Sequence, residues 1–279
     1  MKLQQKFKEL EQSGSALLAI NFYNFETVTG VLQAASEMKM PVILQASPAT
    51  IQYLGIEVTA SLARTTLEKH HVEGWLHLDH AESVDLIKEC LDAGFDSVMI
   101  DASEKPFEEN AEITTRVTEL AKSYEANVEA ELGYVAKLGQ SHEHAGFTKP
   151  DEAKNFTEQT GIDALAVAIG SAHGFYKKDP NLDLDLLKEI HKVTKCALVL
   201  HGGSGIPDSQ IQEGIRRGIR KINVATEVKD IFMQTLQNTL KNNDEIDLRK
   251  VFPVATRAVT RLVRNKLSII RDLQSVSNT

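Results

Sequence analysis

Eight short apolar runs, separated by stretches with helical spacing, are the feature of this chain that most restricts its fold. The runs are mostly rich in Val, Ile, Leu and Ala, and they alternate little between apolar and polar residues. This pattern is typical of parallel strands that are covered on both faces. The predicted strands are Ala16–Tyr23, Pro41–Ser47, Gly74–His80, Ser97–Ser103, Asn127–Gly133, Ala164–Gly170, Ala197–Gly203 and Lys221–Thr226.

Apolar stripes with the period of an amphipathic helix lie between these runs. Alternating strands and helices over 279 residues predict an α/β fold, a single (β/α)8 TIM barrel that spans residues 1–279. The alternative, a doubly wound open sheet, would favour a Gly-rich fingerprint after the first strand, and Asn21–Thr27 has none. The stripes are Val84, Ile87 and Leu91; Ile113, Val117, Leu120 and Ala121; Leu184, Leu187 and Ile190; and Ile211, Ile215 and Ile219.

The sequence after the eighth run predicts two more helices. Glu227–Leu240 would be the eighth barrel helix, and Pro253–Leu273 an extra C-terminal helix rich in Arg and Lys. The stretch Tyr134–Phe147 has neither the strand nor the helix period. A long polar loop after a barrel strand is more often functional than filler.

Composition narrows the classes of partner and the compartment. The formal net charge of −8 and the absence of a basic run make nucleic acid an unexpected partner. Cys90 and Cys196 indicate reduced, buried thiols with no disulfide framework. No signal peptide and no apolar run long enough to span a bilayer is found, so we expect a cytoplasmic protein without a membrane partner.

Polar and ionisable residues gather where the predicted strands end, which is where TIM barrels carry their chemistry. This concentration favours an enzyme. Ser47 is a candidate for binding substrate, although Ser47 and Asp101 could merely cap the following helices. The residues are Asn21, Asn24, Ser47, Asp79, His80, Asp101, Glu131, His173, His201, Asn223 and Thr226.

Three of these residues, His80, His173 and His201, each close an apolar run and precede a turn or a glycine. A single histidine of this kind is more often a hydrogen-bonded structural residue. Three at equivalent positions instead predict a catalytic zinc site, because neutral imidazole is the commonest zinc ligand and such sites keep three protein ligands and one open position.

The loops after the seventh and eighth predicted strands, His201–Pro207 and Asn223–Glu227, are at the usual place of the phosphate cradle in this barrel. His201–Pro207 contains Gly202, Gly203 and Ser204 and leads into a predicted helix, whose N–H groups favour an anion. Lys177 could add a positive charge, or could be an ordinary solvated lysine. Zinc beside a phosphate site suggests a small phosphorylated substrate whose carbonyl the metal polarises, and hence carbon–carbon bond chemistry.

Several motifs in order resemble the class II, zinc-dependent ketose-bisphosphate aldolases. They are HLDH at 77–80, SVMIDAS at 97–103, VEAELG at 128–133, VAIGSAHG at 167–174, LVLHGGSGIP at 198–207 and KINVATE at 221–227. Within that family, LAVAIGSAHG and INVATE are closer to tagatose-bisphosphate aldolases. The fructose-bisphosphate enzymes tend to have Asn-Thr-Asp or Asn-Thr-Glu where this chain has Ala225-Thr226-Glu227.

The resemblance implies zinc on His80, His173 and His201, and Asp79 as the acid/base that acts on the oxygen of the aldehyde fragment. Asp101 and Glu131 would orient ligands or hold a second divalent cation, and a sodium ion near the phosphate is also implied. Glycerone phosphate would be held by Gly174, Gly202, Gly203, Ser204, Asn223, Val224, Ala225 and Thr226. The expected partners are a sugar phosphate and further copies of the chain in a homodimer or homotetramer.

One departure from the family falls in the loop after ELG. Members of the family usually continue with Gly-Gly and a Glu-Asp pair, whereas this chain reads Tyr134–Gln140 and has a shorter loop. Glu143 is the only acid left before Asp151, so it is the candidate for proton transfer at glycerone phosphate.

We therefore expect an aldehyde-lyase that cleaves a ketose 1,6-bisphosphate, with tagatose 1,6-bisphosphate favoured, to glycerone phosphate and an aldehyde such as glyceraldehyde 3-phosphate. One alternative keeps this chemistry and changes the substrate, to fructose 1,6-bisphosphate or to a modified sugar such as 2-deoxy-5-keto-gluconate 6-phosphate. The other is a barrel that binds sugar phosphate without catalysis.

Overall fold

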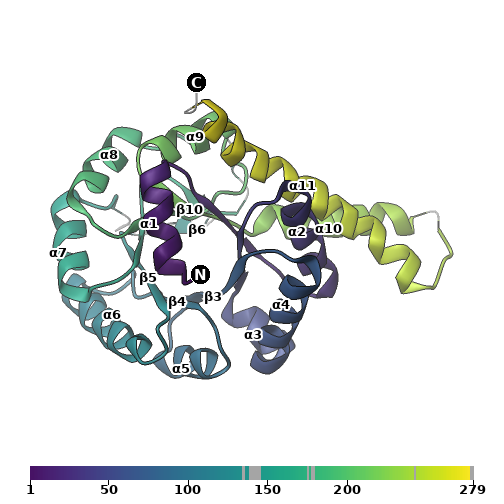
Figure 1. The fold of residues 1–279 in the computed structure, drawn as a ribbon, viewed down its shortest axis with the longest axis horizontal. Helices are drawn as coiled ribbons and strands as arrows, with labels where there is room; N and C mark the ends of the chain where they lie inside the picture. Colours follow the sequence, from purple (N-terminus) through teal and green to yellow (C-terminus); the bar gives the residue numbers. More distant parts are fainter. Residues whose placement is uncertain (134–135, 138–145, 175, 177–179, 242, 277–279) are drawn as a thin grey trace.

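Eight parallel strands close into a barrel in the computed structural model, and helices surround it (Figure 1). The structure describes residues 1–133, 136–137, 146–174, 176, 180–241 and 243–276. Around the barrel the strands follow one another in chain order, and the last pairs with the first, with Ile20 opposite Val224. The predicted (β/α)8 barrel is confirmed. The barrel strands are β1 Leu17–Asn21, β2 Val42–Ala46, β3 Gly74–Ala81, β4 Ser97–Ile100, β5 Asn127–Leu132, β7 Ala164–Val167, β9 Ala197–Leu200 and β10 Ile219–Val224.

Each of the eight predicted runs overlaps a barrel strand, and the predicted stripes fall on helices with one exception. Ile219, placed in a helical stripe by its spacing, is the first residue of β10, because the preceding helix ends at Arg216. The helices are α1 Leu3–Ser13, α2 Phe25–Met38, α3 Pro48–Leu54, α4 Ile56–His70, α5 Val84–Asp92, α6 Phe107–Lys122, α7 Pro150–Thr160, α8 Leu184–Val193, α9 Asp208–Arg216, α10 Thr226–Leu240 and α11 Leu248–Val276.

The N-terminal helix α1, which the sequence reading did not anticipate, lies across one end of the barrel (Figure 1). Its buried side chains Leu3, Phe7 and Leu10 belong to one apolar cluster with interior strand residues such as Ile43 and Trp75. This end is the one at which the strands begin. The helix therefore covers the end of the barrel at which the strands begin. It does not cover the opposite end, where the strands finish.

Side chains inside the barrel change from apolar to polar along each strand. Successive strand residues point to opposite faces, and on β1 Leu17 and Ala19 join the interior cluster while Leu18 and Ile20 face the helices. The next interior position is Asn21. The strands thus begin in a hydrophobic plug and end in a buried polar layer, which is the layer that carries the site.

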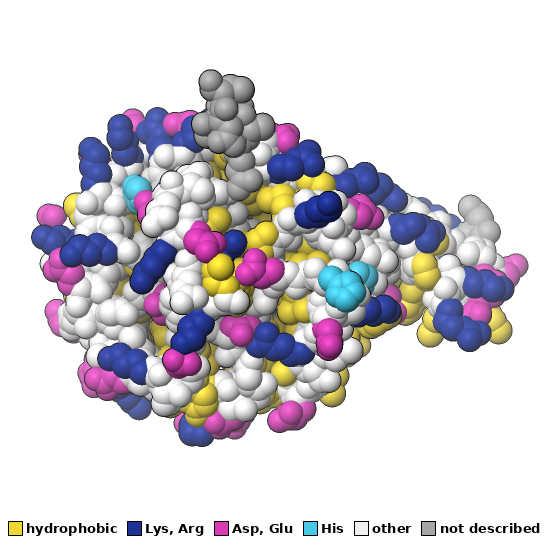
Figure 2. All heavy atoms as spheres, in the orientation of Figure 1, with side chains coloured by type: hydrophobic (Ala, Val, Ile, Leu, Met, Phe, Trp, Pro, Cys, Tyr) yellow, Lys and Arg dark blue, Asp and Glu magenta, His cyan; other side chains and the backbone are white. Residues whose placement is uncertain are grey.

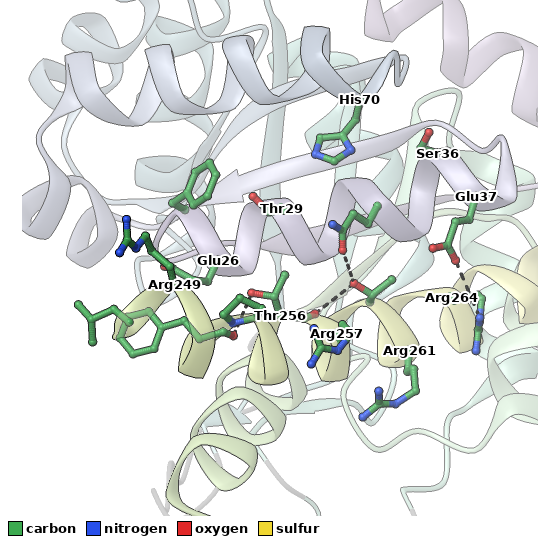
Figure 3. Close-up of a pocket in the computed structure, with 16 residues that line it drawn as sticks. Glu26, Thr29, Ser36, Glu37, His70, Arg249, Thr256, Arg257, Arg261 and Arg264 are labelled. Carbon is green, nitrogen blue, oxygen red and sulfur yellow. Dashed lines mark hydrogen bonds and ion pairs between the residues drawn. The ribbon is translucent and has the colours of Figure 1, made fainter. Parts of the chain in front are cut away.

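The last helix is longer than predicted, beginning at Leu248 and running through Pro253. It packs along α2, where Thr260 donates a hydrogen bond to Gln33 (3.1 Å) and Arg264 lies 3.9 Å from Glu37. A cavity of about 1060 Å³ lies between these helices (Figure 3). With α10, the helix forms an arm that projects from the barrel (Figure 1), and apolar side chains are visible on that arm in Figure 2.

Among the described residues no helix is sufficiently long and hydrophobic to cross a bilayer. Both cysteines are free thiols; Cys90 is buried and Cys196 partly buried.

Candidate active site

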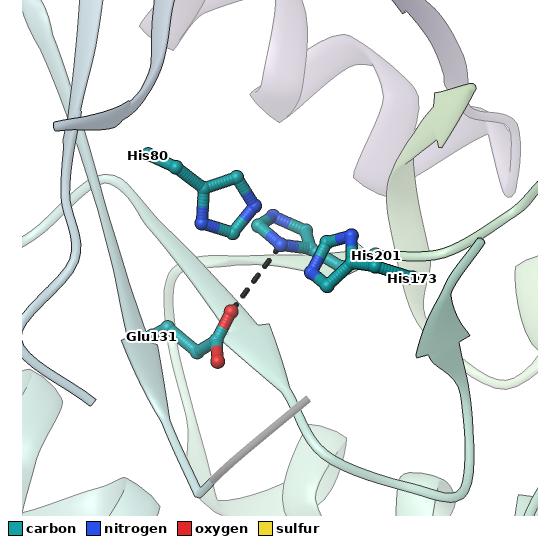
Figure 4. Close-up of side chains that lie close together, drawn as sticks. All are labelled: His80, Glu131, His173 and His201. Carbon is teal, nitrogen blue, oxygen red and sulfur yellow. Dashed lines mark ion pairs between the residues drawn. The ribbon is translucent and has the colours of Figure 1, made fainter. Parts of the chain in front are cut away.

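Three imidazoles and one carboxylate meet at the carboxyl end of the barrel (Figure 4). His80, Glu131, His173 and His201 each offer one ligand atom, and these atoms lie within 4.8 Å of one another. The ring centroid of His80 is 4.9 Å from that of His173 and 4.7 Å from that of His201. The structure therefore brings together the three histidines that the sequence singled out.

A β-bulge explains how Asp79 and His80, which are adjacent in β3, both face the site. In a regular strand, adjacent side chains point to opposite faces. Between Leu78 and Ala81 the register of β3 against β4 shifts, and His80 has a left-handed backbone (φ 53°). Bulges are common next to active sites, where they re-aim a side chain. Here the bulge turns His80 toward the barrel axis without removing Asp79 from it.

His173 reaches the cluster differently from the sequence-based expectation. The barrel strand β7 ends at Val167, so His173 does not close a barrel strand. It lies on β8, Ala172–His173, which pairs outside the barrel with β6, Ala136–Lys137. The long loop predicted as Tyr134–Phe147 thus contributes a short strand that holds the segment carrying this histidine.

Carboxylates fix the orientation of two of the imidazoles. Nδ1 of His80 lies 2.7 Å from Oδ2 of Asp101, so Nε2 of that ring is the nitrogen that faces the cluster. That Nε2 atom is buried and makes no hydrogen bond with the described part of the chain. His201 has the opposite arrangement, with Nε2 2.9 Å from Glu129 and Nδ1 3.3 Å from Glu131. Asp101 therefore lies behind His80, whereas Glu131 is a member of the cluster.

This set of donors fits a divalent cation of the zinc type. Imidazole and carboxylate are ordinary zinc ligands, and a metal-bound histidine usually gives its other ring nitrogen to a carboxylate. Burial lowers the pKa of His173 to about 3, and the charges of the other two rings add to this shift. Burial also opposes the charged form of His201, but hydrogen bonds to Glu129 and Glu131 raise its pKa to about 10. The acids around the cluster favour positive charge, and a cation can supply it.

Asp79 is buried beside the cluster as a charged carboxylate. Its Oδ2 accepts a hydrogen bond from Asn21 (2.9 Å), and its Oδ1 accepts a longer one from Asn223 (3.4 Å). Burial alone would raise the pKa of Asp79, but the nearby charges of His80 and Lys221 lower it. Oδ1 lies 4.0 Å from Nε2 of His80, so the carboxylate adjoins the position that a metal on these ligands would occupy.

A cavity of about 730 Å³ opens onto the cluster. Ser47, Ala225 and Thr226, three of the predicted substrate-binding residues, line it. Ser47 also caps α3, since its Oγ accepts the N–H of Thr50, so the capping role considered for it is compatible with a place at the cavity. Tyr23, which was not predicted, lines the cavity, and Nζ of Lys229 lies 5.6 Å from the centre of its ring.

The two loops predicted to hold phosphate pack against each other. A Cβ at Gly202, where φ is +67°, would lie 2.2 Å from the carbonyl oxygen of Ala172, so only glycine fits. The N–H of Gly203 donates to the carbonyl of Asn223 and is therefore occupied. Ser204 is buried, and its hydroxyl accepts the N–H of Glu227 at the start of α10.

Four other predicted residues divide between the described and the undescribed parts of the chain. The Val224 side chain belongs to the outer hydrophobic core, so only its backbone could contact a substrate. Gly174 directly follows His173 and has a φ of 109°, in the region that favours glycine. Lys177 and Glu143 lie outside the residues that the structure describes.

Sequence reasoning did not predict that two charged residues, Glu129 and Lys221, form an ion pair below the cluster. They stand two residues before Glu131 and Asn223, at positions that face the same side of their strands. This spacing inside otherwise apolar strands was the signal that could have found them.

A model of the family described as class-II fructose-bisphosphate aldolase matches residues 1–275 of the chain. The protein belongs to the class II fructose-bisphosphate aldolase family. It is therefore an aldolase, a lyase that acts on a carbon–carbon bond.

Solved structures of aldolases resemble the chain over nearly its whole length. The YdjI aldolase from Escherichia coli K12 is 29% identical, with a TM-score of 0.84 over 97% of this chain and 96% of that chain. A protein from Coccidioides immitis, described as a candidate fructose-1,6-bisphosphate aldolase, is 25% identical (TM-score 0.86; 98% and 97% covered). The fructose-bisphosphate aldolase from Campylobacter jejuni, at 21% identity and a TM-score of 0.83 (96% and 94% covered), shares the fold.

Proposed function

We propose that this class II aldolase is a zinc enzyme that cleaves a ketose 1,6-bisphosphate, with tagatose 1,6-bisphosphate favoured, to glycerone phosphate and glyceraldehyde 3-phosphate. The observation that carries the proposal is the convergence of His80, His173 and His201 beside the buried carboxylate of Asp79, at a cavity. Bound by the three histidines, zinc would supply a Lewis acid that polarises the substrate carbonyl.

Asp79 is positioned to move the proton of the cleavage step. As a carboxylate it would take the proton from the C4 hydroxyl while the C3–C4 bond breaks and its electron pair passes to the glycerone phosphate fragment. In the reverse direction it would return the proton to the aldehyde oxygen. Hydrogen bonds from Asn21 and Asn223 hold the carboxylate in place and favour its charged form.

The phosphate of glycerone phosphate would bind at the loops after β9 and β10. Gly202 lets the loop after β9 pack tightly against Ala172, and α10 begins at Thr226, directly after β10. The N–H groups at the start of a helix favour an anion. Because the N–H of Gly203 already bonds to Asn223, we expect the hydroxyl of Ser204 and the backbone of Ala225 and Thr226 to contribute instead.

The proposed preference for tagatose 1,6-bisphosphate, which differs from fructose 1,6-bisphosphate in its configuration at C4, rests on Ala225. This residue lines the cavity and offers no side-chain hydrogen bond at the position where fructose-specific relatives tend to have Asn. Sites built to bond a hydroxyl discriminate strongly against analogues that misplace it. Fructose 1,6-bisphosphate is the second candidate, because the family is described as a fructose-bisphosphate aldolase and the Coccidioides immitis structure is named for the 1,6-bisphosphate.

The test is kcat/KM for tagatose and fructose 1,6-bisphosphates, measured side by side at saturating zinc through release of glycerone phosphate. We expect the tagatose substrate to be preferred, and Ala225→Asn to shift the ratio toward fructose. A clear preference of the wild-type enzyme for fructose 1,6-bisphosphate would refute the assignment of substrate and leave the reaction class intact.

We also infer that copies of the chain associate as a homodimer or homotetramer. The support is the arm formed by α10 and α11, near whose tip Ile246 is 92% exposed and Leu248 60% exposed. Large apolar side chains exposed together commonly mark an interaction surface.

A further inference from the structure

A buried ion pair lies directly beneath the histidine cluster. Lys221, on the inner face of β10, is fully buried, and its Nζ lies 2.7 Å from Oε2 of Glu129 on β5. The other carboxylate oxygen, Oε1, lies 2.9 Å from Nε2 of His201, which is also fully buried. The three side chains thus form one chain of contacts from Lys221 to an imidazole of the cluster.

The neighbouring His77 does not provide an alternative donor to Glu129. Its Nδ1 lies 2.7 Å from the hydroxyl of Ser97, which itself donates to Asn127. That hydroxyl has only one hydrogen, so it accepts from Nδ1, and Nε2 of His77 is then the unprotonated nitrogen. Nε2 of His77 is 3.8 Å from Glu129 and makes no hydrogen bond with any residue that the structure describes. Glu129 is therefore held by Lys221 and His201.

This arrangement decides which nitrogen of His201 can bind a metal. A carboxylate accepts hydrogen bonds, so Nε2 of His201, 2.9 Å from Glu129, carries a hydrogen whether the ring is charged or neutral. Nδ1 is then the nitrogen left for a metal, which would replace the proton that the metal-free imidazolium directs at Glu131. Nδ1 is the nitrogen on the side of Glu131, 3.3 Å from its Oε2. Without Lys221, the second oxygen of Glu129 would be a buried negative charge with no donor, which is costly in a protein interior.

We propose that Lys221 and Glu129 are positioning residues that hold His201 with Nε2 protonated and Nδ1 directed at the metal. Neither residue touches substrate in this account; both act through His201. The inference rests on the proposed zinc site and adds the residues that set its geometry. It also gives the one lysine inside the barrel strands a role other than forming a Schiff base with substrate.

Two variants and a matched control test the inference. Lys221→Met removes the ammonium, and Glu129→Gln keeps the size of the side chain but places an amide N–H₂ group against either Lys221 or His201. Arg220→Met is the control, because Arg220 is the adjacent buried cation of β10, paired with Glu11 of α1. Zinc affinity is measured by competition with a chromophoric chelator, and the visible spectrum of the cobalt-loaded protein reports ligand geometry.

We expect zinc affinity to fall about 10- to 100-fold in both variants, the usual effect of losing a group that orients a metal ligand. Their cobalt spectra should change, while Arg220→Met keeps the wild-type affinity and spectrum. Wild-type affinity and spectrum in Glu129→Gln and Lys221→Met would overturn the inference. A wild-type protein that binds no zinc would overturn the proposed function itself, which keeps the two failures distinct.

A measurement on the wild-type protein covers the case in which a variant fails to fold. ¹⁵N NMR of the histidine rings in the zinc-loaded protein, assigned with His201→Ala, distinguishes protonated from metal-bound nitrogens. The inference requires a protonated Nε2 and a metal-bound Nδ1 on His201. A metal-bound Nε2 on this residue would overturn it.

Discussion

Asp79 shows at the scale of a single residue how position sets chemistry. It is an interior residue of β3, and Asn21 and Asn223 hold it from two other strands. Two donated hydrogen bonds and the neighbouring positive charges keep it a carboxylate, which is the form that a general base requires. One residue earlier, at the position of Leu78, the same carboxylate would instead be buried among apolar side chains on the face covered by helices.

Asp79→Asn should therefore separate binding from proton transfer. The amide has the same shape, so zinc content and phosphate binding should remain close to wild type. Retro-aldol turnover should fall by about 10²–10⁴, the usual contribution of a general acid or base. Steady-state kinetics alongside metal analysis make the check, and turnover near that of the wild type would show that Asp79 is structural.

The sequence predicted which residues form the site better than it predicted the backbone conformations that bring them together. The three histidines and Asp79 could be singled out because ionisable groups end apolar runs. The bulge at His80 could not, because no Gly or Pro marks the left-handed residue. Nor could β8, since a strand of two residues carries no periodic signal. The spacing of Glu129 and Lys221 could have placed them on the inner face, but their pairing across the barrel could not be predicted, because it depends on which strands lie opposite each other.

The elements themselves followed closely from the sequence. Each barrel strand lies within or overlaps a predicted run, since strands buried on both faces are recognisable as continuous apolar segments. The helix α1 was missed because its apolar face is narrow: only Leu3, Phe7 and Leu10 are buried. Its role became visible only once the barrel end that it covers was in place.

An ion pair between α1 and the barrel gives a prediction about pH. Oε2 of Glu11 accepts a hydrogen bond from Arg220 (2.7 Å), and Oε1 lies 2.9 Å from Nε2 of His191. Burial opposes the charge on Glu11, but Arg220 outweighs it and lowers the pKa of the carboxyl. Because the folded-state pKa lies below the unfolded one, the stabilisation is complete above the unfolded pKa and is lost as the pH falls through the folded one.

Glu11→Gln should thus lower the free energy of unfolding at pH 7 by at most about 1 kcal/mol, since the Glu11 side chain is half exposed and solvent screens the pair. The difference from the wild type should shrink as the pH is lowered below about 4. Urea unfolding at several pH values measures it. A difference that stayed constant down to pH 3 would show that the charge of Glu11 does not contribute.

At the scale of the whole molecule, the two ends of the barrel have different roles: one is packed with apolar side chains, and the other carries the candidate active site. The end at which the strands begin is plugged by α1, and the end at which they finish carries the polar layer, the cluster and the cavity. The larger cavity between α2 and α11 shares no lining residue with the cavity at the histidines. The size of a cavity is therefore a poor guide to the site in this protein, and the chemistry of its lining is a better one.

The projecting arm gives a prediction about assembly. Ile246 is 92% exposed and Leu248 is 60% exposed, so we expect another copy of the chain to cover these two apolar side chains. Ile246→Asp combined with Leu248→Asp should shift the mass measured by light scattering toward the monomer, whereas Ile246→Val should not. A wild-type protein that is monomeric at micromolar concentration would contradict the prediction.

The central claim, that His80, His173 and His201 hold the zinc ion on which the aldolase reaction depends, is tested most directly by metal content and glycerone phosphate release measured on the same samples. Wild-type protein should contain about one zinc ion per chain, lose turnover on treatment with a chelator and recover it when zinc is restored. His201→Ala should lose both the metal and the turnover. Turnover that survives complete removal of the metal, or full zinc occupancy in His201→Ala, would contradict the account.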